Sequence, residues 1–273
     1  PPRSTLFPYT TLFRSIQACV ESLLSLEKAS PTHEIIVVDN GSDDGTLDLL
    51  LQYSDIKVVK EHKIRGAAAA RNAGVREAKG TVLAFTDADC VVTTGWIANV
   101  LRYFDEPGVC GVGGKIEGVA PKNEIQQWMN ARKILDQEAT LRHPFLPFLQ
   151  TANAFFRRGD FVKLGGFDIE IPYGEDTDFC WRITVMTGQK LMLAPDALVY
   201  HDHRSTIKGL FHQSKKNAMA GAYLEKNGPA NCRKRSGKRA CGNVTTSEEA
   251  FGDMHGQSSL LYPRNARPLP CSI

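Results

Sequence analysis

Acidic side chains follow two short apolar runs in this sequence. Asp39 ends "EIIVVD", and Asp87 and Asp89 come just after "TVLAF". A single acidic residue at a strand end is more often a turn or cap residue than a ligand. Two carboxylates one residue apart in a crevice repel each other, and a divalent cation between them relieves the repulsion. The Asp87-Ala88-Asp89 pattern therefore predicts Mg²⁺ or Mn²⁺ bound together with ligand phosphates.

A second acidic cluster lies in "GGFDIEIPYGEDTDFCW". Its glycines permit tight turns, and acids at the start of the following helix favour the positive end of the helix dipole. Helix capping explains some of these acids, but five within eleven residues exceed what capping needs. They are Asp168, Glu170, Glu175, Asp176 and Asp178.

Two histidines follow in "VYHDHR". His201 and His203 are two residues apart, so on a strand they point to the same side. Such a pair is as often a surface feature as a ligand pair. Imidazole suits Mn²⁺-type sites, and the acidic clusters strengthen the ligand interpretation of these two residues.

Alternating strand and helix patterns indicate how these residues are positioned. The alternation predicts an α/β parallel sheet, which binds ligands at the carboxyl ends of its strands. Strands are expected at 34–40, 56–61, 81–89, 109–118, 151–158 and 197–203. Helices are expected at 16–28, 42–54 (capped by Ser42 or Asp43), 66–80, 96–105, 122–140, 175–187 and 207–227, with a turn at 159–168.

The two ends of the chain do not follow this pattern. Residues 1–15, "PPRSTLFPYTTLFRS", resemble a translated sequencing adapter and are expected to be artefactual, the alternative being a natural Pro-rich arm. Residues 228–273 fit neither a helix nor a strand template and are expected to be a disordered or frame-shifted tail. A domain spanning residues 16–227 is left between them.

Composition excludes several classes of protein. The net charge of +3 includes +2 from residues 1–15 and +4 from residues 228–273, so the middle carries −3. A mildly acidic body is unlike a nucleic-acid-binding surface. The seven cysteines are scattered without a C-x-x-C pair, which indicates a reducing compartment and argues against a disulfide framework or a zinc site. There is no apolar run of roughly 18 residues that would span a membrane.

Taken in order and spacing, the motifs resemble those of family 2 glycosyltransferases with the GT-A fold. The resemblance covers residues 16 to about 227 and rests on an ordered set of segments. They are "EIIVVDNGSDDGT", "RGAAAARNAG", "VLAFTDADC", "LGGFDIEIPYGEDTDFCWR" and "VYHDH". It implies a Rossmann-like, mixed but mostly parallel sheet with helices on both faces. The family's first strand, expected between 34–40 and 81–87, is missing or replaced here by residues 1–15, although "TLFP" could fill part of its place.

The resemblance also assigns roles to individual residues. Asp176 is implied as the catalytic base, and Asp89 and His201 as metal ligands, with His203 spare. The nucleotide contacts implied are Asp39, Arg71 and Asp87. Residues expected near the donor sugar or the acceptor are Asn153, Gly166, Glu175 and Asp178.

The implied activity is inverting transfer of a sugar from a nucleotide diphosphate sugar, usually UDP-linked, with Mn²⁺ or Mg²⁺. The acceptor is expected to be a glycan, a lipid-linked molecule or a small molecule, in cell-envelope polysaccharide synthesis. Gln213 lacks the Arg-Trp partner of the processive Q-x-x-R-W motif, so a non-processive enzyme is expected. The expected location is the cytoplasm, with residues 207–225 either leaning on the inner membrane surface or packed on the core.

Two other classes remain open from the sequence. One is a nucleotide-sugar-binding subunit or inactive fragment that does not turn over, against which the complete set of acids argues. The other is a dinucleotide-binding oxidoreductase, because Asp39 also ends a strand. In that class the Asp87/Asp89, Glu175/Asp176 and His201 set would have no role.

Overall fold

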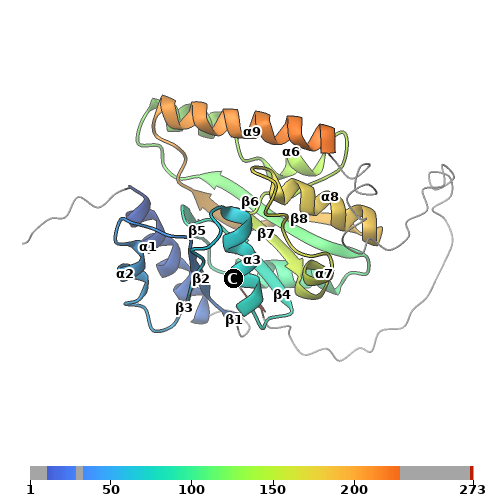
Figure 1. Ribbon diagram of the computed structural model, residues 1–273, viewed down its shortest axis with the longest axis horizontal. Helices are drawn as coiled ribbons and strands as arrows, with labels where there is room; N and C mark the ends of the chain where they lie inside the picture. The colour runs from blue at the N-terminus through green and yellow to red at the C-terminus, as the bar shows by residue number, and fades with distance from the viewer. Residues whose placement is uncertain (1–10, 29–32, 228–270, 273) are drawn as a thin grey trace, which may run out of the picture.

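The computed structural model describes residues 11–28, 33–227 and 271–272, and helices and strands alternate along them (Figure 1). The helices are α1 (Thr11–Leu24), α2 (Thr46–Leu50), α3 (Ala67–Glu77), α4 (Ala98–Leu101), α5 (Glu124–Ala131), α6 (Gln137–Leu141), α7 (Arg158–Lys163), α8 (Glu175–Thr187) and α9 (Ile207–Asn227), with 3-10 turns η1 (Ser25–Lys28) and η2 (Arg102–Asp105). The strands are β1 (His33–Glu34), β2 (Ile36–Asp39), β3 (Lys57–Lys60), β4 (Val82–Thr86), β5 (Cys90–Val92), β6 (Val109–Gly118), β7 (Asn153–Arg157), β8 (Lys190–His201) and β9 (Cys271–Ser272).

The strands of the described residues form two sheets. The larger has the order β1-β9-β4-β7-β6-β8-β5, and the smaller is the pair β2-β3. Four pairings are parallel (β1-β9, β9-β4, β6-β8 and β2-β3) and three are antiparallel (β4-β7, β7-β6 and β8-β5). The α/β fold with a mixed, mostly parallel sheet predicted from the sequence is therefore confirmed.

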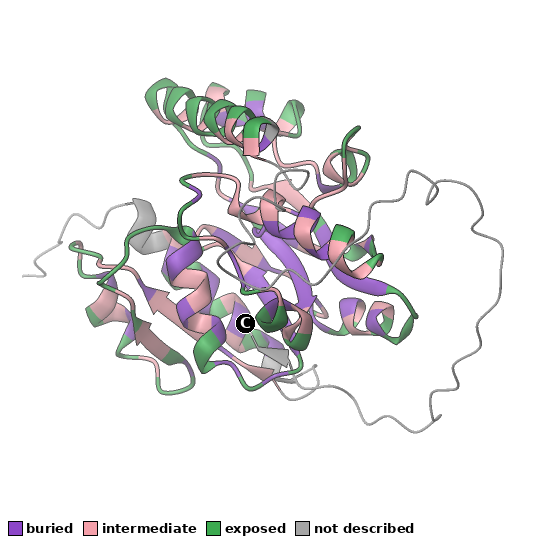
Figure 2. Cartoon of the chain, turned by 45° about the vertical axis from the view of Figure 1, so that its right-hand side comes forward, coloured by how far each residue is buried: buried purple, intermediate pink, exposed green. Residues whose placement is uncertain are grey.

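Helices cover both faces of the larger sheet because its central strands are apolar on both sides. Successive residues of β4 enter opposite cores: Val82 and Ala84 pack with α1 and α4, whereas Leu83 and Phe85 pack with α3, α7 and α8. Figure 2 shows the central strands as largely buried and α9 as mostly exposed. The second core is built on contacting phenylalanine rings, namely Phe85, Phe156, Phe161, Phe167 and Phe179.

A narrow apolar slot separates β2 from β4. Its volume is about 190 Å³, and α1 and α3 close its two faces. Within the described residues β2 pairs with β3 alone, and β4 pairs on this side only with β9, at Val82 and Leu83. The slot lies between the two strands that the family resemblance expects to flank the first strand. Its walls include Ile36, Val37 and Val38 from β2, and Leu83, Ala84 and Phe85 from β4.

Several local predictions need correction. The helix expected at 16–28 begins at Thr11, inside the segment assigned to the adapter, and ends as the 3-10 turn η1. Residues 1–10, including "TLFP", lie outside the described residues, as does most of the tail. Cys271 and Ser272, in the tail expected to be disordered, pair as β9 between β1 and β4.

Three further differences concern local backbone chemistry. The cap expected at Ser42 or Asp43 is wrong, because α2 begins at Thr46 after Gly45, which has a φ of 83° and no side-chain cap bond. Asp44 instead accepts hydrogen bonds from the amide and hydroxyl of Thr46. The strand expected at 34–40 is divided between the two sheets, and residues 159–163 of the expected turn belong to α7, which begins at Arg158.

Candidate active site

A large cavity of about 1730 Å³ opens where β4 ends. Figure 1 shows α9 lying across this part of the molecule, above α6 and α8. The cavity brings together most of the chemistry-bearing residues predicted from the sequence. Its lining includes Arg71, Asp87, Asp89, Glu175, Asp176, His201 and Arg204.

The Asp87-Ala88-Asp89 turn joins β4 to β5 and directs both carboxylates toward their expected partners. Asp89 Oδ1 lies 3.4 Å from His201 Nε2, and Asp89 Oδ2 lies 4.0 Å from a guanidinium nitrogen of Arg204. The backbone holds the turn, since the Cys90 amide donates to Asp87 O and the Asp202 amide to Asp89 O. These contacts hold the start of β5 against the end of β8 at the cavity.

Burial raises the pKa of Asp89, and the Asp87 carboxylate raises it further, although His201 acts in the opposite direction. A divalent cation beside this carboxylate would remove that penalty. Ligand atoms of Asp89, Cys90 and His201 lie within 4.8 Å of one another, a spacing that one metal ion can bridge. The residues therefore fit the expected cation, and Cys90 is a neighbour that the sequence patterns did not single out.

His201 and His203 are both buried, and their rings stack with centroids 4.8 Å apart. The Nδ1 atoms of both rings lack a hydrogen-bond partner within the described part of the chain. Burial lowers the pKa of His203 to about 4, helped by the adjacent His201, so His203 is neutral at physiological pH. The uncharged His203 ring therefore lies against the His201 ring.

Arg71 joins the aspartate turn to the second acidic cluster. Its guanidinium lies 2.7 Å from Asp87 Oδ1 and 2.6 Å from Glu175 Oε1. Burial alone would lower the pKa of Arg71, but the carboxylates of Asp87 and Glu175 outweigh it and raise the pKa. The arginine thus places a permanent positive charge between β4 and the N-terminus of α8.

Asp176 lies in the first turn of α8, after Gly174, whose φ of 86° turns the chain into the helix. Its carboxylate accepts hydrogen bonds from the backbone amides of Thr177 (2.8 Å) and Thr151 (3.4 Å). Burial and, after it, the neighbouring Glu175 carboxylate raise the pKa of Asp176 to about 6, against the opposing effect of Arg71. A carboxylate tuned in this way suits a general base near neutral pH.

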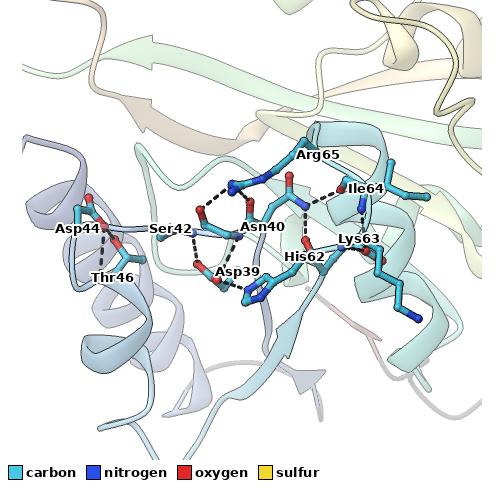
Figure 3. A network of polar contacts seen from close by, with 11 residues as sticks. Asp39, Asn40, Ser42, Asp44, Thr46, His62, Lys63, Ile64 and Arg65 are labelled. Carbon is cyan, nitrogen blue, oxygen red and sulfur yellow. Dashed lines mark hydrogen bonds and ion pairs between the residues drawn. The ribbon is translucent and has the colours of Figure 1, made fainter.

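Asp39 is buried, and it is not among the residues that line the cavity. Figure 3 shows its carboxylate facing His62, whose Nε2 lies 2.9 Å away, while the Gly41 and Ser42 amides donate to it. Burial alone would raise the pKa of Asp39, but these hydrogen bonds outweigh it and hold the pKa below its ordinary value. Arg65 connects this network to the cavity, since it donates to the Asn40 and Gly41 carbonyls and also lines the cavity.

Three other predicted residues have structural partners. Asn153 is buried and bonds to Trp96 Nε1 and to the carbonyls of Lys115 and Ala197. Asp178 pairs with Arg182 at 2.7 Å. Gly166 has a φ of 70°, and a Cβ there would lie 2.7 Å from Asn72 Oδ1. None of the three is among the residues lining the cavity.

Known proteins are similar to this chain in sequence. The family model for glycosyl transferase family 2 matches residues 11–165. A pre-mycofactocin glycosyltransferase of Mycobacterium tuberculosis is 33% identical over 181 residues, which cover 64% of this chain but only 38% of that protein. Glycosyltransferase AglE of Haloferax volcanii is 28% identical over 207 residues, covering 74% of this chain and 67% of that protein.

Solved structures share the fold. A mannosyltransferase from Pyrobaculum calidifontis, in complex with GDP-Man and Mn²⁺, has a TM-score of 0.61 at 22% identity, over 79% of this chain and 61% of that one. GalNAc-T7 with UDP, GalNAc and Mn²⁺ has a TM-score of 0.53 at 21% identity, over 70% of this chain and 41% of that one. The GT-A fold expected from the sequence is confirmed. Because the family model matches more than half of the 273 residues, the chain belongs to glycosyl transferase family 2.

Proposed function

We propose that this domain transfers a sugar from a nucleoside diphosphate sugar to an acceptor hydroxyl, with inversion at the anomeric carbon. The observation that carries the proposal is the placing of the Asp89–His201 pair and of Asp176 around one cavity. Asp89 and His201 fit a diphosphate with its cation. Asp176 presents a carboxylate with a raised pKa that can take a proton.

The donor end of the reaction develops negative charge as the diphosphate leaves. Mn²⁺ or Mg²⁺ bound by Asp89 and His201 would supply positive charge at that leaving group. The chain contributes Arg71 and Arg204 on the same cavity wall, which add fixed positive charge beside the two carboxylates. UDP is the proposed nucleotide, with Asp39 and its loop as the base-binding region.

The acceptor end needs a base. In a direct displacement the acceptor oxygen bonds to the anomeric carbon, the carbon–diphosphate oxygen bond breaks, and Asp176 takes the hydroxyl proton. A single displacement inverts the configuration. The backbone amides of Thr177 and Thr151 fix the carboxylate in one orientation without neutralising it. The sequence after Gln213 lacks the Arg-Trp partner of the processive Q-x-x-R-W motif, which supports non-processive transfer.

Relatives support the donor class. The GDP-Man and UDP complexes named above are nucleotide complexes with Mn²⁺. A further relative from Escherichia coli, 36% identical over 93 residues, is named as a transferase acting between UDP-Glc and a diphosphoundecaprenol-linked sugar. These matches support a nucleotide-sugar donor, whereas each named acceptor belongs to the relative concerned.

A donor screen tests the proposal. The chain is incubated with UDP- and GDP-linked sugars, with Mn²⁺, Mg²⁺ or EDTA, and release of the nucleoside diphosphate is followed. We expect cation-dependent release from at least one donor. Nucleotide binding without release from any donor, with or without candidate acceptors, would favour a nucleotide-sugar-binding subunit instead.

A further inference from the structure

The segment that follows β8 carries part of the proposed cation site but has no regular structure of its own. The strand pairing of β8 ends at His201. Residues 202–205 belong to neither a helix nor a strand, and α9 begins soon after them. The distances from Asp89 to His201 and to Arg204 therefore depend on what holds this segment in place.

Gln126, on α5, holds the segment with its side-chain amide. The residue is 2% exposed, and its Nε2 donates to Asp202 Oδ1 at 2.9 Å and to His203 O at 2.7 Å. Its Oε1 accepts a hydrogen bond from the Lys122 amide at 2.8 Å. Both N–H groups and the carbonyl of the side chain are thus engaged, which fixes its orientation. A hydrogen bond to a carboxylate is also stronger than one between neutral groups.

Two neighbours of Gln126 add contacts to the same segment. Asn123 caps α5 by accepting from the Gln126 amide at 3.0 Å, and its Nδ2 donates to Ser205 O at 2.9 Å. Lys122 Nζ lies 2.7 Å from Asp202 Oδ2, but its side chain is 62% exposed, so this ion pair is expected to contribute little. We call Lys122, Asn123 and Gln126 the α5 clasp.

The α5 clasp contacts the chain on both sides of Arg204 and directly after His201. The Asp202 amide donates to Asp89 O at 2.8 Å, so the residue that Gln126 holds is also bound to the aspartate turn. None of the three clasp residues is among those lining the cavity. The clasp therefore acts on a ligand through the residues that it holds.

We propose that the α5 clasp positions the cation site and that Gln126 makes its main contact. By holding residues 202–205 against α5, it sets where His201 and Arg204 stand relative to Asp89, and thereby how tightly Mn²⁺ binds. Partners that orient metal ligands typically contribute about 10–100-fold to metal affinity. The inference rests on the proposed function, because it needs Asp89 and His201 to bind the cation.

Gln126→Met tests the clasp, because it keeps the length and volume of the side chain and removes both amide donors. The matched control is Gln137→Met. Gln137 is also 2% exposed, and its amide donates to Asn153 O at 2.8 Å and accepts from the Gln150 amide at 2.8 Å, so the backbone it holds belongs to another segment. Electron paramagnetic resonance measures Mn²⁺ binding with and without UDP, and circular dichroism reports on folding.

We expect Gln126→Met to weaken Mn²⁺ binding by about tenfold or more, and Gln137→Met to leave it within about twofold of the parent. The resonance spectrum of the bound Mn²⁺ should also change in Gln126→Met, because a loss of overall stability does not alter the ligand geometry in the molecules that stay folded. Unchanged Mn²⁺ affinity in Gln126→Met, equal losses in both variants, or no Mn²⁺ binding by the parent would each overturn the inference.

Asn123→Ser is a milder variant that decides the question if Gln126→Met does not fold. Serine retains the helix cap but is too short to reach Ser205 O. It should weaken Mn²⁺ binding by about threefold. With Gln126→Met unfolded, unchanged affinity in Asn123→Ser overturns the inference.

The dependence of the rate on Mn²⁺ separates this inference from the proposed function. Gln126→Met should raise the Mn²⁺ concentration for half-maximal nucleotide release by about tenfold and leave the rate at saturating Mn²⁺ within about threefold of the parent. A lower rate at saturation with an unchanged half-maximal concentration would place the effect on the chemical step and overturn the inference. If the parent releases no nucleotide but binds Mn²⁺ more tightly than Gln126→Met, the proposed function fails and the clasp still positions a cation site.

Discussion

The two sides of the slot between β2 and β4 are held by different means. On one side, β4, β7, β6 and β8 form a continuous sheet whose phenylalanine core contacts α7 and α8. On the other side, β2 and β3 pair only with each other within the described residues. Asp87, Asp89, His201 and Asp176 all stand on the continuous side, whereas Asp39 stands on the detached pair.

The two sides of the slot therefore suit two different proposed roles. Proton transfer and cation binding need distances fixed to a fraction of an ångström. The residues proposed for them stand on paired strands and a packed helix. Binding of a nucleotide base tolerates more movement. If the proposed roles hold, substitutions on the continuous side should affect rate and cation binding, and changes at the slot should affect stability and nucleotide affinity.

The largest effect is expected at Asp176. Asp176→Asn should lower the transfer rate by roughly 10²–10⁴-fold, because it removes the general base, and should leave donor affinity unchanged. Steady-state kinetics and calorimetry with UDP and Mn²⁺ measure the two quantities. Asp196→Asn is the matched control, since Asp196 pairs with Arg102 on the surface and lies outside the cavity lining. A rate within about threefold of the parent in Asp176→Asn would assign the base to another residue, Asp178 or Asp168.

Asp89→Ala tests the cation end of the same side. Loss of a direct ligand should weaken Mn²⁺-dependent binding of UDP by more than about tenfold, since even indirect partners of metal ligands contribute that much. Calorimetry with UDP in Mn²⁺ and in EDTA separates the cation-dependent part of the affinity. The two proteins should bind UDP equally in EDTA. Equal affinity in Mn²⁺ as well would remove Asp89 from the cation site.

The pKa of Asp176 predicts the pH dependence of the rate. Burial, with help from Glu175, raises that pKa to about 6, although Arg71 from α3 opposes the shift and the Thr177 and Thr151 amides also face the group. The base must be ionised, so the rate should fall about tenfold per pH unit below pH 6. A pH–rate profile at saturating donor measures this limb, and a rate that stays constant down to pH 5 would contradict it.

The same shift predicts a change in stability of the opposite sense. The folded state holds the Asp176 proton more tightly than the unfolded state, whose pKa is near the ordinary 3.8. The stability from this group is fully present below that value and is lost as the pH rises through about 6. The melting temperature of Asp176→Asn, compared with the parent, should therefore increase between pH 5 and pH 8.

The sequence predicts the continuous side better than the detached side. Helix α8 has the predicted bounds because glycines stand at both of its ends, at 174 and 188. Asp89 meets His201 because β5 and β8 pair in register, which strand order determines and local pattern does not show. The ring contact between Phe145 and Trp181 has no periodic signal, since the two residues come together only through tertiary packing.

Errors on the detached side have a common physical cause. The apolar run at 34–40 predicts one strand, but it is divided at Ile35 because its two parts pair with different neighbours. The helix after it begins at Thr46, later than its cap residues suggest, since Asp44 binds Thr46 and Gly45 makes the turn. Pairing partners decide the structure here, and the sequence pattern does not identify them.

A graft at the slot tests whether the detached side lacks a strand. Replacing residues 1–15 with a Val/Ile-rich strand that ends in Pro-Thr-Tyr-Asn should raise the melting temperature, by about 2–4 °C for each kcal/mol gained, and should tighten UDP binding. The reason is that the walls of the slot are apolar and that, within the described residues, β2 pairs with β3 alone and β4 pairs on this side only at Val82 and Leu83. A control graft with alternate lysines should give neither gain. If the apolar graft also changes neither quantity, residues 1–15 do not replace a first strand.

The smallest effect is expected at α9, which belongs to neither side of the slot. None of the helices within the described residues combines the length and apolar character needed to cross a bilayer. Along one face of α9, however, Ile207 and Phe211 are 74% and 66% exposed and are followed one turn later by the exposed Lys215, with Lys208 beside them. Apolar side chains next to lysines are typical of a helix that lies on an anionic lipid surface.

We expect the protein to sediment with phosphatidylglycerol vesicles at low salt and to remain in solution with neutral vesicles. Each lysine near the surface contributes about 1 kcal/mol, and screening reduces that contribution, so raising the salt should release the protein. Phe211→Ser should weaken binding by about tenfold, whereas Val185→Ser, which removes an apolar side chain that is 44% exposed on α8, should not. If the parent fails to sediment with anionic vesicles at low salt, α9 does not bind a lipid surface, and the alternative of an ordinary helix packed on the core is favoured.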